Sequence, residues 1–116
     1  MGDNTVIHVE VVGKDGPALQ KFYGDVLGWD FDTDNPGGYG MAPASDNGVV
    51  TGIGGTQDGG PGHVTFYVAV KDIDQALEKA TKLGGRVIQP KFSPGANATI
   101  ALFADPEGHV VGLSQA

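Results

Sequence analysis

The chain has 116 residues, of which fourteen are acidic and seven basic, so its formal net charge is −7 at pH 7, and it contains no cysteine. This length suits one domain with a modest core, and the negative charge disfavours binding to nucleic acid or to an anionic membrane surface. The absence of cysteine excludes disulfides and thiolate metal sites, and because no apolar run is long enough to cross a membrane we expect a cytoplasmic protein.

The first half of the chain predicts a strand followed by a helix. Residues 5–12 are rich in β-branched side chains and predict a strand that carries His8 and Glu10 on the same face. Asp15 is typical of a helix start and Gly28 of a helix end. Between them a stripe of apolar side chains is expected to be buried, namely Leu19, Phe22, Tyr23, Val26 and Leu27. Three short strands are predicted to follow, over residues 29–33, 39–42 and 49–54.

The second half of the chain repeats this order. After a glycine-rich crossing at residues 55–62, the pattern predicts a strand over residues 63–70 and a helix that begins at Asp72 or Asp74 and ends before Gly84. Three more strands are predicted, over residues 86–91, 99–104 and 109–114. His63 follows His8 by about 55 positions and each opens an equivalent apolar run, which indicates a duplicated module. We therefore expect one domain made of two βαβββ modules, residues 5–54 and 63–115.

Specific sequence elements accompany this duplication: Phe22-Tyr23 and Leu27-Gly28-Trp29 at the end of the first predicted helix, Leu83-Gly84-Gly85 at the end of the second, and the closing turn Asp105-Pro106-Glu107-Gly108. With these elements the chain resembles the vicinal oxygen chelate superfamily, which includes glyoxalase I, extradiol dioxygenases, fosfomycin resistance proteins and bleomycin-binding proteins. The resemblance implies an α+β fold in which two tandem βαβββ modules form an open, cupped mixed sheet. It also implies a homodimer and a small substrate held with a divalent metal inside the cup.

The metal site that the resemblance implies is incomplete in this chain. Of the four ligand positions of glyoxalase-like sites, His8 and His63 match two. The other two, which commonly hold carboxylates, are matched by Gly52 and Gly112. Because glycine has no side-chain donor, the standard four-ligand site and the proton transfer that uses a metal-bound carboxylate are not expected here.

Two interpretations of the retained polar residues stay open. His8 and His63 are candidate ligands for Zn, Ni, Mn or Fe, with Glu10 as the third ligand. Alternatively, the histidines line a pocket or are buried against hydrogen-bonding neighbours. Glu10 is a candidate general acid or base if it lies in an apolar cup, or else a solvated or ion-paired carboxylate. His109 is not expected to be a ligand, because strand alternation places it on the face opposite Gly112.

Loss of two carboxylates enlarges the floor of the expected cavity, which favours a flat or aromatic ligand. Some of the residues that we expect to contact it could instead be core residues; the set is Tyr39, Met41, Gly52, Tyr67, Phe92 and Gly112. The sequence thus favours a small-molecule-binding protein without the standard metal site, which sequesters a drug or metabolite or carries out metal-free acid–base chemistry. The alternative is a divalent-metal-dependent lyase, isomerase or dioxygenase that uses His8 and His63.

Overall fold

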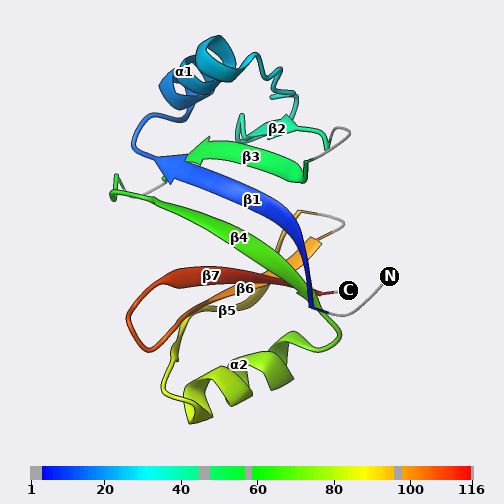
Figure 1. Cartoon of the computed structure of the whole chain (residues 1–116), viewed down its shortest axis with the longest axis vertical. Helices are drawn as coiled ribbons and strands as arrows, with labels where there is room; N and C mark the ends of the chain where they lie inside the picture. The colour runs from blue at the N-terminus through cyan, green and yellow to red at the C-terminus, as the bar shows by residue number, and fades with distance from the viewer. Residues whose placement is uncertain (1–3, 45–47, 57–58, 96–97, 116) are drawn as a thin grey trace. The chain divides into compact units, whose positions relative to one another are not determined.

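The structure is a computed structural model of the chain, and it describes residues 4–44, 48–56, 59–95 and 98–115 (Figure 1). The chain divides into two compact units, His8–Val64 and the remainder, in which Met1–Ile7 joins Thr65–Ala116. The elements in chain order are β1 (Thr5–Gly13), α1 (Gly16–Leu27), β2 (Gly40–Ala42), β3 (Val50–Gly55), β4 (His63–Val70), α2 (Ile73–Lys82), β5 (Arg86–Gly95), β6 (Ala98–Ala104) and β7 (Val110–Gln115). The α+β class is confirmed. Neither helix in the described residues is long and apolar enough to cross a membrane.

In the unit His8–Val64, the strands lie in the order β2, β3, β1, with β1 parallel to β3 and β2 antiparallel to it. Ile53 on β3 is fully buried, and Thr51 and Ala42 are nearly so. The strand predicted over residues 29–33 is present only as a single bridge between Asp32 and Met41. The neighbouring aromatic rings explain this, because Trp29 stacks on Tyr23 of α1 and so keeps the segment beside the helix.

Helix α1 begins and ends where the sequence predicts. The Asp15 carboxylate accepts a hydrogen bond from the Ala18 amide at 3.0 Å, and Gly28 ends the helix with a φ of 74°. The prediction that the whole apolar stripe is buried is wrong in part. Phe22 and Val26 are more than half exposed, and Leu27 is half exposed.

The side of α1 that packs shares Leu19 with the predicted stripe but otherwise differs from it. It runs through Gly16, whose added Cβ would lie 2.8 Å from the backbone nitrogen of Gly55, and through Leu19 beside Gly13. Gln20 continues this side, since its amide donates to the Ile53 carbonyl of β3 at 2.8 Å. A glycine and a glutamine thus take positions that hydrophobicity alone does not mark.

In the other unit, the strands lie in the order β4, β7, β6, β5, with β4 parallel to β7 and the remaining pairs antiparallel. Helix α2 packs on β5, β6 and β7. It begins at the Asp72 cap, the first of the two predicted starts. The core is apolar and consists of Val70, Ile73, Leu77, Ala101 and Leu113. The βαβββ order of this half is as predicted.

Candidate functional site

Strands β1, β2 and β3 bring the predicted site residues of one unit into a row. Glu10 on β1 is the register partner of Gly52 on β3, and Met41 on β2 is the partner of Gly52 from the other side. His8 lies two positions before Glu10 and so projects from the same face of β1. Three of the expected site residues thus follow one another across the sheet, with His8 beside them.

The Tyr39 side chain lies on this row. A Cβ added at Gly52 would be 1.8 Å from the Tyr39 hydroxyl oxygen, and one added at Gly54 would be 2.6 Å from Tyr39 Cδ1. Such distances are far below any real contact between carbon and its neighbours. The Tyr39 ring therefore fills the space that side chains at positions 52 and 54 would need.

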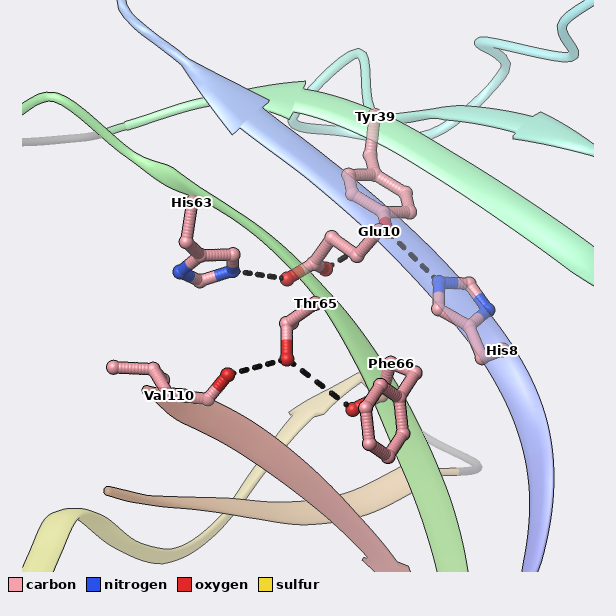
Figure 2. Close-up of polar contacts among 7 residues, drawn as sticks. All are labelled: His8, Glu10, Tyr39, His63, Thr65, Phe66 and Val110. Carbon is pink, nitrogen blue, oxygen red and sulfur yellow. Dashed lines mark hydrogen bonds and ion pairs between the residues drawn. The ribbon is translucent and has the colours of Figure 1, made fainter. Parts of the chain in front are cut away.

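A chain of hydrogen bonds joins four side chains at this place (Figure 2). The Tyr39 hydroxyl donates to Glu10 Oε1 at 2.8 Å, and its oxygen lies 2.9 Å from His8 Nε2. His63 Nε2, at the start of β4, lies 2.8 Å from Glu10 Oε2. Glu10 is thereby held through both of its oxygens.

The directions of these bonds fix the protons. An ionised carboxylate can only accept, so His63 donates its Nε2 hydrogen to Glu10. The Tyr39 hydroxyl has one hydrogen, which goes to Glu10, so the hydrogen in the contact with His8 comes from His8 Nε2. This assignment places a hydrogen on Nε2 of both imidazoles.

Burial accounts for the electrostatics of the site. The Glu10 side chain is 12% exposed and that of His63 25% exposed. Loss of hydration on burial lowers the pKa of His8 from its ordinary value, and the nearby Glu10 charge opposes this only in part. His8 is therefore mostly neutral at pH 7, and a neutral imidazole can still donate from Nε2.

Two residues that the sequence analysis did not single out hold Tyr39 in place. Asn35 Oδ1 accepts from the Tyr39 amide at 3.0 Å, and Asn35 Nδ2 donates to the Tyr39 carbonyl at 2.7 Å. Gln20 of α1 also donates to the Gly38 carbonyl at 3.1 Å. Residues 34–38 lie between two predicted strands, but nothing in their sequence marks Asn35 as the residue whose side chain binds the backbone of Tyr39.

The donor set does not fit the four-ligand metal site that the family resemblance implies. The position of the second ligand is glycine, and the Tyr39 phenol stands over it. The Nε2 atoms of His8 and His63 contact Tyr39 and Glu10 respectively and do not face one common point. Within the part of the chain that the structure describes, no three His, Asp or Glu side chains converge as metal ligands would.

The remaining predicted site residues belong to the other unit and are described by themselves. Tyr67 on β4 is the register partner of Gly112 on β7, and a Cβ added at Gly112 would lie 2.3 Å from its ring. Tyr67 is 7% exposed, so this ring is part of the core. Phe92 on β5 is 40% exposed. His109 lies in the turn before β7 and contacts Asp105 at 3.0 Å.

Open hollows lie away from the hydrogen-bonded side chains. One of about 660 Å³ follows α2 and is lined in part by Lys71, Lys79 and Lys82. Another of about 540 Å³ lies between the start of α1 and Gly38. Neither hollow is lined by Glu10 or Tyr39. The space above Gly52 is not open, because the Tyr39 ring fills it.

Known proteins resemble this chain in sequence and in structure. A protein of Mycobacterium bovis named "Putative glyoxylase CFP32" is 34% identical over 93% of the chain, which spans only 44% of that relative's length. A glyoxalase/bleomycin resistance protein/dioxygenase superfamily member from Vibrio splendidus superposes with a TM-score of 0.62 at 22% identity, over 97% of this chain and 99% of its own. A methylmalonyl-CoA epimerase from Streptomyces coelicolor gives a TM-score of 0.62 at 16% identity, over 99% of each chain. These two structural likenesses show the fold alone.

The model of one protein family covers almost the whole chain. It is the model of the glyoxalase-like domain, and it matches residues 8–114. The matched range includes all four side chains that are joined by hydrogen bonds, which are His8, Glu10, Tyr39 and His63. This protein belongs to the glyoxalase-like domain family.

Proposed function

We propose that this chain binds a small oxygen-bearing molecule at Glu10 and exchanges a proton with it, without the four-ligand metal centre of glyoxalase-like enzymes. The observation that carries the proposal is the Tyr39 hydroxyl, which stands over Gly52 and links His8 to Glu10. A tyrosine thus occupies the place of a metal-binding carboxylate.

Glu10 has the properties of a proton acceptor. Its carboxylate is largely withdrawn from water, and the two hydrogen bonds from Tyr39 and His63 fix its orientation. A positioned carboxylate with neighbouring donors suits general acid–base catalysis, because the donors stabilise its charge and can pass a proton onward. Hydrogen bonds from His63 and Tyr39 stabilise the ionised carboxylate of Glu10, which is the form that accepts a proton.

The names of related proteins give the first compounds to test. The Mycobacterium bovis relative carries a glyoxylase name, and one structural neighbour is a methylmalonyl-CoA epimerase. We therefore start with α-oxoaldehyde–thiol adducts and acyl thioesters, and follow exchange of their carbon-bound hydrogen for deuterium by NMR.

The experiment compares chelator-treated protein with protein supplied with Ni, Zn, Mn or Fe(II). Binding or exchange is expected to be unchanged by the chelator and to fall at least tenfold in Glu10→Gln, while Glu107→Gln, in the exposed closing turn, should match the wild type. Metal bound in near-stoichiometric amount, lost in the double variant His8→Ala and His63→Ala and required for exchange, would overturn the proposal.

A second candidate is the metal-dependent lyase, isomerase or dioxygenase, and the observation in its favour is that histidines flank Glu10 on both sides. For this function the Tyr39 ring would have to leave the space above Gly52. Both histidines would also have to turn a nitrogen lone pair toward one point. The metal measurement above distinguishes this candidate from the first.

We also propose that the chain works as a homodimer. Support comes from α1, where Phe22, Val26 and Leu27 leave a contiguous part of the helix apolar and exposed. Burial of such a surface against a second copy would remove it from water. Sedimentation equilibrium is expected to give twice the chain mass, and Val26→Glu should shift the population to monomer.

A further inference from the structure

The space above β3 has the shape of one aromatic ring. Gly52 and Gly54 stand at alternate positions of the strand, so their missing side chains leave a gap on the same face. The Tyr39 ring fills this gap, with Cδ1 over Gly54 and the hydroxyl over Gly52. We call the space above Gly52 and Gly54 the glycine slot.

The polar end of the glycine slot is built for a phenol. A phenol has one hydrogen to donate and oxygen lone pairs that accept. Glu10 Oε1 takes the hydrogen at 2.8 Å, and the oxygen accepts from His8 Nε2, 2.9 Å away. Because Glu10 is also bonded to His63, it presents a fixed acceptor, and His8 Nε2 presents a donor, to whatever lies between them.

Tyr39 occupies the slot from a loop, not from the sheet. Its backbone precedes β2 and is held by the Asn35 side chain, while Gly38 next to it has a φ of 68°. Tyr67 offers a contrast, because its ring covers Gly112 from a neighbouring strand and is 7% exposed. The backbone of Tyr67 lies within a paired strand, whereas that of Tyr39 lies in the loop before β2.

We propose that the glycine slot is a binding site for phenols, in which Tyr39 stands in for the ligand until one displaces it. This inference rests on the function proposed for Glu10 and names its ligand class. A bound phenol lies with its ring over Gly52 and Gly54 and its hydroxyl between His8 and Glu10. Tyr39 then moves out with the segment 35–39.

The test removes the Tyr39 side chain by mutation and adds free phenol to the solution. Tyr39→Ala deletes the equivalent of phenol, and titration of metal-free protein with phenol is followed by ¹H–¹⁵N NMR. Phenol is expected to bind at least tenfold more tightly than benzene, which lacks the hydroxyl. Adding Gly52→Ala to this variant should weaken phenol binding at least tenfold, because the new methyl group enters the slot. Tyr23→Ala, which removes a ring elsewhere in the same unit, should create no phenol site.

Displacement is tested in protein that keeps Tyr39. Asn35→Ala frees the loop, so phenol should bind to it at least threefold more tightly than to the wild type. The proposal would be overturned if folded Tyr39→Ala showed no saturable phenol binding. It would also be overturned if this variant bound benzene as tightly as phenol, or if adding Gly52→Ala left its affinity for phenol unchanged. An Asn35→Ala variant no tighter than the wild type would overturn the displacement of Tyr39. Metal content of the same samples separates the failures: metal held by His8 and His63 overturns the metal-free function, whereas failure of phenol to bind metal-free protein overturns the slot alone.

Discussion

The hydroxyl oxygen of Tyr39 lies 1.8 Å from where a Cβ at Gly52 would be, so these two positions are coupled. A side chain at 52 excludes the tyrosine from its place over β3. The tyrosine in turn brings its hydroxyl to Glu10 as a hydrogen-bond donor. The glycine at position 52 and the phenol that lies over it therefore depend on each other.

Gly52→Ala is expected to expel Tyr39 and to lower the free energy of unfolding by about 1–3 kcal/mol, as forced overpacking does. The hydrogen bonds of Tyr39 to Glu10 and His8 would be lost with it. Urea unfolding followed by circular dichroism measures the effect. Gly37→Ala is the matched control, because its Cβ would meet only Asn35 Oδ1 at 4.0 Å. Equal stability of the two variants would show that Tyr39 does not depend on Gly52.

Glu10→Gln is expected to cost about 1–3 kcal/mol of stability, because two hydrogen bonds to a charged acceptor become weaker or are lost. The amide has only one accepting oxygen for the two donors, Tyr39 and His63. The Nε2 hydrogen of His63 should then exchange faster with water and its NMR signal should broaden. A His63 signal that stays sharp in the variant would contradict the bond to Glu10.

Much of the fold could be predicted because it depends on local signals. Asp15 and Asp72 mark helix starts through their side-chain carboxylates and Gly28 marks a helix end through its left-handed backbone, and both helices begin at the predicted caps. The buried stripe of α1 was wrong at Phe22 and Val26, because hydrophobicity cannot tell a face that packs on its own sheet from one left exposed. The packing face was set instead by backbone approach at Gly16 and by a Gln20 hydrogen bond to β3.

Of the residues that the sequence singled out, the structure brings His8, Glu10, Tyr39 and His63 together, but the hydrogen bonds among them could not be predicted. Strand alternation placed His8 and Glu10 on one face, and the duplication paired His8 with His63. The contact of Tyr39 with Glu10 joins residues 29 positions apart through a loop whose path the sequence does not specify. A signal was present, since glycines two apart on a strand leave a gap on one face that something must fill.

Stability is expected to fall as the pH is lowered from about 6.5 through the folded-state pKa of His8. Burial lowers this pKa below 6.5, so in that window the unfolded chain binds a proton that the folded chain does not. His8→Gln removes the titration and should give a flatter profile of unfolding free energy between pH 7 and pH 5. His109→Gln, at an exposed histidine, should keep the wild-type slope. The hydrogen bond from the His109 amide is the main cause that lowers the pKa of Asp105. The stability that the Asp105 carboxylate contributes is therefore lost only in more acidic solution. Parallel profiles for wild type and His8→Gln would show that His8 is not the group responsible.

Asn35→Ala is expected to loosen Tyr39 without removing any group from the site itself. Both backbone hydrogen bonds of Tyr39 to Asn35 are lost, at about 1 kcal/mol each, and the amide of Tyr39 should exchange with deuterium at least tenfold faster. Asn35→Asp separates the two bonds, because the carboxylate keeps the acceptor for the Tyr39 amide and loses the donor to its carbonyl. Its amide exchange should lie between those of wild type and Asn35→Ala. If Asn35→Ala leaves the exchange of Tyr39 unchanged while Gly52→Ala accelerates it, the grip on Tyr39 comes from the slot and not from the loop.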